Sequence, residues 1–216
     1  MSLTLVIGNK NYSSWSLRPW LYLKHHGLAF EEIRIPLYRE DSKPKILAHS
    51  PAGKVPVLID GDLAVWDSLA ILEYLAERFP ETAGWPRLPS DRARARSLAA
   101  EMHSGFLALR THCGMNCRRP PAVKAVPEAV YQDVARIGQI WRDCRERFAG
   151  EGPWLFGRFT IADAMYAPVA LRFATYRLEA GPVAAEYVST VLGHPAMWEW
   201  MEAGRAEIEV IPAFED

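Results

Sequence analysis

The chain has 216 residues, 50% of them hydrophobic, and a formal net charge of −1 at pH 7. This length and apolar content allow one large domain or two small ones, and the near-zero charge argues against nucleic acid as the main partner. The sequence has no apolar run of about 18 residues and no basic, then apolar, leader, so we expect neither a membrane span nor a secretory signal.

The first 80 residues follow an alternating order of strands and helices. We expect a strand, a helix, a strand, a short helix, a hairpin and a helix, at residues 3–7, 17–26, 30–35, 44–49, 57–59 with 63–66, and 68–79. Gly27 is placed to end the first helix, and Asp60-Gly61-Asp62 lies between two apolar runs as a hairpin turn. The order βαβ, then ββα, predicts a thioredoxin-like α/β domain over residues 1–80.

A segment rich in proline and glycine follows, and we interpret residues 81–90 as a linker. Beyond it the pattern is helical, with no convincing strand, at residues 91–110, 127–148, 161–176 and 194–206. The sequence therefore predicts an all-α domain over residues 91–216.

The three cysteines, Cys113, Cys117 and Cys144, form an odd and sparse set. Such a set suits a reducing, cytoplasmic compartment better than a disulfide framework. Cys113 and Cys117 lie four residues apart and near His112, but no fourth ligand follows, so we expect no metal.

Pro56 opens an apolar strand, although proline has no N–H for the ladder. The usual solution is a special turn, often with a cis X-Pro bond, which would free the backbone N–H and C=O of Val55 for a peptide. Asp67-Ser68 begins the next helix, and a helix N-terminus favours a carboxylate. A backbone edge for a peptide, a helix end for its carboxylate and an acid for its amine together predict a glutathione site.

Three motifs resemble the cytosolic glutathione transferase family, and the resemblance covers nearly the whole chain. They are residues 12–18 (YSSWSLR), residues 50–58 (SPAGKVPVL) with 67–71 (DSLAI), and residues 160–164 (TIADA). The first resembles the active-site segment of serine-type enzymes of the zeta, tau and related bacterial classes. The third resembles the family's structural capping box, in which Thr160 and Asp163 exchange hydrogen bonds.

The first domain has no cysteine, so disulfide exchange by a protein thiol is excluded there. A serine hydroxyl that donates to the glutathione sulfur would instead favour the thiolate. Pro19 predicts a helix cap near Ser16, which leaves Ser13 and Ser14 in the preceding loop. The spacing between Ser13 and Arg18 resembles the serine-type enzymes and favours Ser13 as the catalytic hydroxyl, with Ser14 as the alternative. We expect Arg18 to tie the helix down through ion pairing.

The resemblance also implies how glutathione is gripped. The Val55 backbone would pair with the cysteinyl unit, and Lys54 would reach the glycyl carboxylate. The hydroxyl and N–H of Ser68 would hold the γ-glutamyl carboxylate and Asp67 its amine, roles that are compatible with capping the helix. Glutathione is therefore the expected cosubstrate.

We expect the electrophile to lie between the domains. His103, Phe106 and Arg110 have the spacing i, i+3, i+7 and are predicted to share one helical face. Arg110, or the pair Arg118-Arg119, would suit a substrate carboxylate. Trp15, beside the serines, would shape the pocket for flat, apolar electrophiles.

The leading hypothesis is a glutathione transferase that attacks a small electrophile with bound thiolate, as in detoxification. A maleylacetoacetate-type isomerase is one alternative, although Trp15 stands where those enzymes carry cysteine and the arginines after Pro168 do not match their offset. A non-catalytic, partner-binding module is the other. The resemblance further implies a cytoplasmic homodimer that binds neither nucleic acid nor membrane.

Overall fold

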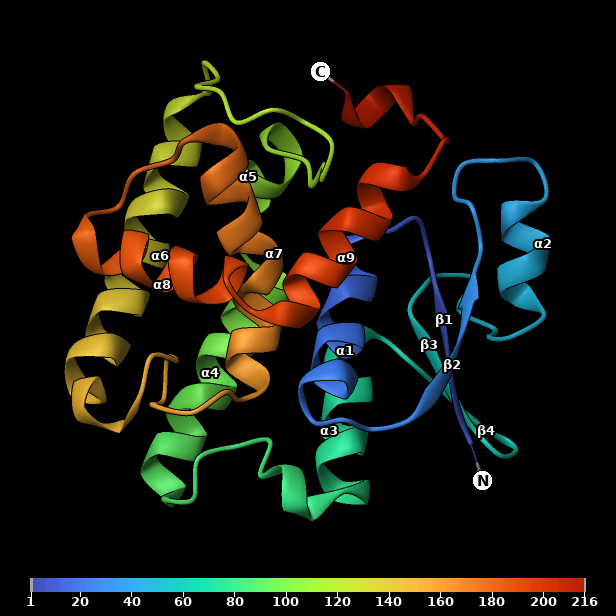
Figure 1. The fold of residues 1–216 in the computed structure, drawn as a ribbon, viewed down its shortest axis with the longest axis horizontal. Helices are drawn as coiled ribbons and strands as arrows, with labels where there is room; N and C mark the ends of the chain where they lie inside the picture. The colour runs from blue at the N-terminus through green and yellow to red at the C-terminus, as the bar shows by residue number, and fades with distance from the viewer. Residues whose placement is uncertain (1, 216) are drawn as a thin grey trace.

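The computed structural model describes residues 2–215 (Figure 1). Its N-terminal part contains a four-stranded sheet in the order β2-β1-β3-β4. The strands are β1 (Leu3–Ile7), β2 (Phe30–Arg34), β3 (Val57–Asp60) and β4 (Leu63–Trp66). β1 and β2 are parallel, whereas β3 pairs antiparallel with both β1 and β4. This is the predicted thioredoxin-like arrangement.

Helices cover both faces of the sheet. Figure 1 shows α1 (Ser14–His25) and α3 (Ser68–Arg78) between the sheet and the helical half, and α2 (Ser42–Leu47) on the other side. The helical half contains α4 (Pro89–Ser104), α5 (Leu107–His112), α6 (Glu128–Arg147), α7 (Ile161–Tyr176), α8 (Pro182–Leu192) and α9 (Pro195–Ala206). Short 3₁₀ turns lie at Pro80–Thr82, Ala149–Glu151 and Pro212–Phe214. Within residues 2–215, no helix combines the length and the apolar character needed to cross a bilayer.

One hydrophobic core joins the two halves. It runs from β1, α1 and α3 into α4 to α9, and Trp20 of α1 lies edge-on to Trp200 of α9 with ring centroids 5.1 Å apart. The central helix, α7, has 15 buried residues and begins with the predicted capping box, in which the Thr160 N–H donates to Asp163 at 2.8 Å. Because α7 packs against both α1 and α4, it fixes the boundary along which the two halves meet.

Most of the predicted helices differ from the observed ones by one to three residues at their ends, and two of the differences affect the site. The first helix begins at Ser14, and its cap is Ser13 rather than Ser16, because the Ser13 side chain accepts from the Ser16 N–H. Pro19 therefore lies inside the helix. The predicted helix over residues 91–110 is broken: α4 ends at Ser104, and Phe106 adopts the left-handed conformation with φ 54°.

The backbone at the break requires glycine at position 105, because a Cβ atom there would lie 2.6 Å from the carbonyl oxygen of Glu101. The prediction that His103, Phe106 and Arg110 share one helical face is therefore wrong. The helix α8 (Pro182–Leu192) was not predicted from the sequence, and α4 already begins at Pro89, within the expected linker.

Candidate functional site

Two adjoining cavities form a groove, one within the first domain and the other between the two domains. The first-domain cavity, about 590 Å³, is lined by Trp15, Leu37, Tyr38, Arg39, Ser42, Lys43, Ile46, Gly53, Lys54, Val55 and Asp67. The interdomain cavity, about 270 Å³, is lined by Tyr12, Ser14, Trp15, Leu37, Tyr38, Arg110, Gly114, Met115, Arg172 and Phe214. They share the side chains of Trp15, Leu37 and Tyr38, so a ligand in one can reach a ligand in the other.

The turn before β3 leaves a free backbone edge in the first-domain cavity. The Val55-Pro56 peptide bond is cis, as the sequence suggested. Within residues 2–215, neither the N–H nor the C=O of Val55 is hydrogen-bonded to another part of the chain. Because Val55 also lines the cavity, its backbone is available to pair with an extended peptide.

The start of α3 supplies an acid, Asp67, that lines the same cavity. Asp67 caps α3 with φ 76°, a left-handed conformation that is rare outside glycine, and its Oδ1 accepts from the Leu69 N–H at 2.9 Å. Its Oδ2 lies 3.2 Å from Nε2 of His103. The main-chain N–H of Ser68 has no partner within the described residues, and a helix N-terminus with a free N–H suits a carboxylate.

The Ser68 hydroxyl does not face the groove. Ser68 is fully buried, and its Oγ accepts a hydrogen bond of 3.1 Å from Nη1 of Arg18. Arg18 forms no ion pair within the described part of the chain, contrary to our expectation; it hydrogen-bonds Ser68 and lies over the Trp15 ring at 4.4 Å. Burial, followed by repulsion from Arg172 and Arg110, lowers the pKa of Arg18 to about 9.

Basic side chains surround the far part of the first-domain cavity. Arg39, Lys43 and Lys54 all line it and are exposed. Gly53, with φ 57°, brings the backbone close to Lys43, whose Nζ would lie 2.7 Å from a Cβ at this position. This end of the cavity therefore suits a carboxylate of a peptide ligand.

The two candidate serines differ in where their hydroxyl groups point. The Ser13 O–H donates to Oγ of Ser16 at 2.7 Å, and Ser13 lines neither cavity. Ser14 lines the interdomain cavity, and its Oγ accepts a 3.3 Å hydrogen bond from Nη2 of Arg172. The proton of the Ser14 hydroxyl has no acceptor within residues 2–215, so it is free to be donated to a ligand.

Of the electrophile-site candidates, Trp15 and Arg110 line the interdomain cavity, whereas His103 and Phe106 do not. The His103 ring lies edge-on behind Trp15, with centroids 5.1 Å apart. Phe106 is buried in the common core. The break after α4 explains this outcome, because it turns Phe106 away from the groove.

Arg172 lines the interdomain cavity, although no sequence motif predicted it as a site residue. Its Nε donates to the Cys113 carbonyl at 2.8 Å and its Nη1 to the Pro168 carbonyl at 3.2 Å, which leaves Nη2 for Ser14. A usable signal was present, because Arg172 and Asp163 are the two charged residues in an otherwise uncharged stretch, residues 161–176.

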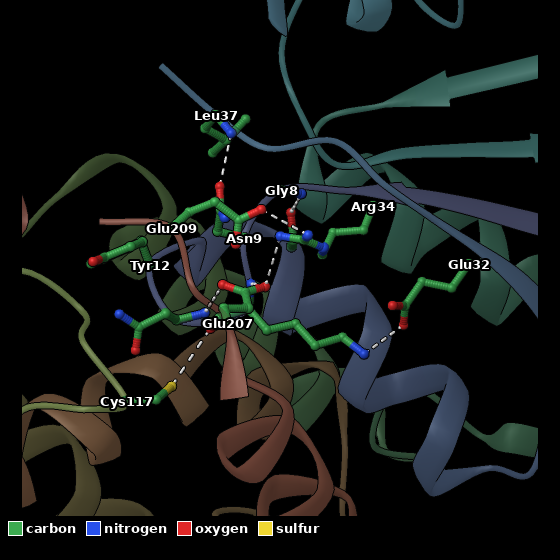
Figure 2. Close-up of polar contacts among 12 residues, drawn as sticks. Gly8, Asn9, Tyr12, Glu32, Arg34, Leu37, Cys117, Glu207 and Glu209 are labelled. Carbon is green, nitrogen blue, oxygen red and sulfur yellow. Dashed lines mark hydrogen bonds and ion pairs between the residues drawn. The ribbon is translucent and has the colours of Figure 1, made fainter. Parts of the chain in front are cut away.

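The segment after α9 packs against the loop that follows β1 and against Arg34 of β2 (Figure 2). The Glu207 carboxylate accepts from the N–H groups of Lys10 and Asn11, at 2.7 and 3.1 Å, and pairs with Arg34 of β2. Phe214 reaches the interdomain cavity and packs near the Tyr12 ring, with centroids 5.7 Å apart.

This segment also forms hydrogen bonds with the Tyr12 hydroxyl. The hydroxyl donates to the Glu215 carboxylate and accepts from Nη2 of Arg118 at 2.6 Å and from the Ile211 N–H at 3.3 Å. Tyr12 is therefore not free to donate to a ligand in the cavity, which leaves Ser14 as the hydroxyl of residues 12–18 that both lines the cavity and has a free proton. Arg118, a predicted carboxylate ligand, instead holds this segment, because it donates to the main-chain carbonyls of Glu207 and Glu209.

The protein has no thiol suited to nucleophilic attack. All three cysteines are unpaired and buried. Burial raises the pKa of Cys117 and of Cys144 to about 12, and it raises the pKa of Cys113 as well. A thiolate in this groove must therefore come from a ligand. Among residues 2–215, no three His, Cys, Asp or Glu side chains are arranged to hold a metal, and the absence of a metal remains a prediction.

Comparison with known proteins identifies the family. The family described as "Glutathione S-transferase, N-terminal domain" matches residues 12–78, and its C-terminal counterpart matches residues 120–203. "Glutathione S-transferase F10" of Arabidopsis thaliana is 40% identical and covers 85% of both chains. "Maleylacetoacetate isomerase" of Pseudomonas aeruginosa is 32% identical over 87% of this chain and 90% of its own. The matches to two other curated relatives are partial, and the chain spans 34% and 44% of their length.

The fold is also similar to that of a solved structure. A glutathione transferase homolog from Burkholderia, solved with bound glutathione, aligns with a TM-score of 0.70 over 96% of this chain and 100% of its own, at 24% identity. Both domain families are matched in chain order, and the structure contains both folds. This chain therefore belongs to the glutathione S-transferase family.

Proposed function

We propose that the protein is a serine-type glutathione transferase, which binds glutathione in the first-domain cavity and attacks a small electrophile in the interdomain cavity. The observation that carries the proposal is the free O–H of Ser14, which faces the interdomain cavity beside the junction at Trp15. Glutathione supplies the thiol, and the serine donates a hydrogen bond to the thiolate without forming a covalent bond.

The groove offers a partner for each part of glutathione. The Val55 backbone pairs with the cysteinyl unit, and the basic end of the cavity, including Lys54, holds the glycyl carboxylate. Asp67 takes the γ-glutamyl amine, and the Ser68 main-chain N–H takes the γ-glutamyl carboxylate. The Ser68 hydroxyl instead acts indirectly, by holding Arg18.

The proposal assigns the catalytic hydroxyl to Ser14 rather than to Ser13. The sequence spacing favoured Ser13, but that hydroxyl is used within the first turn of α1. We expect Ser14→Ala to lower kcat/KM for 1-chloro-2,4-dinitrobenzene by about 100-fold, with little change in the calorimetric Kd for glutathione. Ser13→Ala is the matched control, and a larger loss in that variant would contradict the assignment.

A glutathione-dependent isomerisation is the second candidate reaction, supported by the 32% identity to the Pseudomonas aeruginosa isomerase. Turnover of maleylacetoacetate, compared with turnover of the aromatic halide, decides between the two reactions. If the wild type fails to bind glutathione, both enzyme proposals fail and a partner-binding module replaces them.

The proposal includes a cytoplasmic homodimer. Three unpaired cysteines support a reducing compartment, and the exposed Leu63 and Trp66 on the edge strand β4 support burial against a second copy. Light scattering during size-exclusion chromatography tests the dimer, since a monomer mass at working concentration would contradict it.

A further inference from the structure

Arg172 brings an unpaired positive charge from the helical half to the catalytic serine of the other half. The residue is 5% exposed, and the Cys113 and Pro168 carbonyls hold its guanidinium in place. The remaining nitrogen, Nη2, donates to Oγ of Ser14. Arg172 lines the interdomain cavity, and within residues 2–215 no carboxylate forms an ion pair with it.

We propose that Arg172 is a positioning residue for thiol activation: it orients the Ser14 hydroxyl and its charge stabilises the thiolate of glutathione bound beside it. The inference rests on the proposed glutathione function of the groove. It makes the thiol chemistry of the first domain depend on a side chain of α7.

The orientation follows from the chemistry of a hydroxyl, which has one proton and two acceptor lone pairs. Arg172 donates to Ser14, so it occupies a lone pair and leaves the proton pointing away from the guanidinium. Ser14 lines the cavity, and its proton is therefore directed at a ligand sulfur. The thiol proton itself leaves to solvent, and the thiolate remains as the anion.

The charge acts over a short distance. Arg172 lies 3.3 Å from Ser14 Oγ, so a sulfur hydrogen-bonded to Ser14 lies roughly 6 Å from the guanidinium. An opposite charge at about that distance shifts a pKa by roughly 1–3 units. The thiol pKa falls, because the positive charge favours the ionised form.

The neighbouring charges make the site receptive to an anion. Arg110 of α5 and Arg18 of α1 add charge of the same sign, and Asp67 is the acid that faces Arg18. Burial and the charge of Arg110 lower the pKa of Arg172 to about 10, so it stays protonated at neutral pH. Cys113 and Tyr176, the other titratable groups that face Arg172, have raised pKa values and stay neutral there.

The test compares Arg172→Met and Arg172→Lys with Arg142→Met, a change at an exposed arginine of α6. For each variant we would follow the thiolate absorbance of bound glutathione against pH, together with the pH profile of kcat/KM. In Arg172→Met we expect the apparent thiol pKa to rise by about one unit or more, while the Kd for glutathione changes less than about threefold. Arg172→Lys should raise the apparent thiol pKa less, and Arg142→Met should leave it unchanged.

An unchanged thiol pKa in Arg172→Met overturns the inference while leaving the proposed function intact. Absence of glutathione binding by the wild type would instead overturn the proposed function. If Arg172→Met does not fold, Arg172→Lys is combined with Ser14→Ala. If Arg172→Lys shifts the thiol pKa less in the Ser14→Ala protein than in the wild type, Arg172 acts through the serine. Equal shifts of the thiol pKa in the two proteins contradict that action.

Discussion

The Asp163 carboxylate is buried at the start of α7, and we expect its replacement by alanine to destabilise the fold strongly. Its oxygens accept from the N–H groups of Leu155 and Thr160, at 3.0 and 2.8 Å, from the Thr160 hydroxyl at 2.9 Å, and from the Tyr187 hydroxyl at 3.0 Å. The carboxylate therefore joins α7 to α8 and to the loop that precedes α7. Burial raises the pKa of Asp163 to about 6, so the group is still mainly ionised at neutral pH.

The size of the effect follows from these contacts. In Asp163→Ala the hydroxyls of Thr160 and Tyr187 can rotate toward other acceptors, but the two backbone N–H groups cannot. Each buried N–H without an acceptor costs about 1–3 kcal/mol, and loss of the charged acceptor adds to this. We therefore expect the free energy of unfolding to fall by about 3–5 kcal/mol.

Urea unfolding at neutral pH, followed by tryptophan fluorescence, measures this change, with Asp143→Ala as the control. Asp143 is exposed on α6, and its replacement should alter stability by no more than about 0.5 kcal/mol. A loss below about 1 kcal/mol in Asp163→Ala, or equal losses in the two variants, would refute the reasoning.

Three further predictions concern other parts of the molecule. Nδ1 of His25 lies 2.9 Å from Nε2 of His194, and burial lowers the pKa of His25 to about 4, below its unfolded value. The free energy of unfolding should therefore fall as pH drops from about 6.5 to 4. In thermal melts His25→Gln should reduce this acid sensitivity, and an unchanged pH profile would contradict the prediction. Glu207→Ala leaves two N–H groups of the loop after β1 without their acceptor, and chemical unfolding should show a loss of about 2–4 kcal/mol, whereas a neutral result would mean that water replaces the carboxylate. Trp15→Ala should raise KM for aromatic halides, because Trp15 lines both cavities, and unaffected halide turnover would count against a role in shaping the pocket.

Local signals in the sequence were sufficient for much of the first half. The strands at residues 3–7 and 63–66 have the limits predicted, because each is a short apolar run bounded by turn residues. The hairpin turn at Gly61 and the capping box at Thr160 are likewise encoded within a few residues. The cis peptide bond before Pro56 and the cap role of Asp67 could also be inferred from sequence.

The sequence alone therefore determined the family, the order of the elements and the first-domain part of the groove. The tertiary structure decided which hydroxyl faces the ligand: Ser13 turns into its own helix, whereas Ser14 meets Arg172, 158 residues away. It also decided that the Tyr12 hydroxyl donates to Glu215, in the segment after α9, and that Phe106 does not line the groove. Periodicity and motif spacing report on neighbours along the chain, but the site is assembled from segments that meet only when α7 packs against α1.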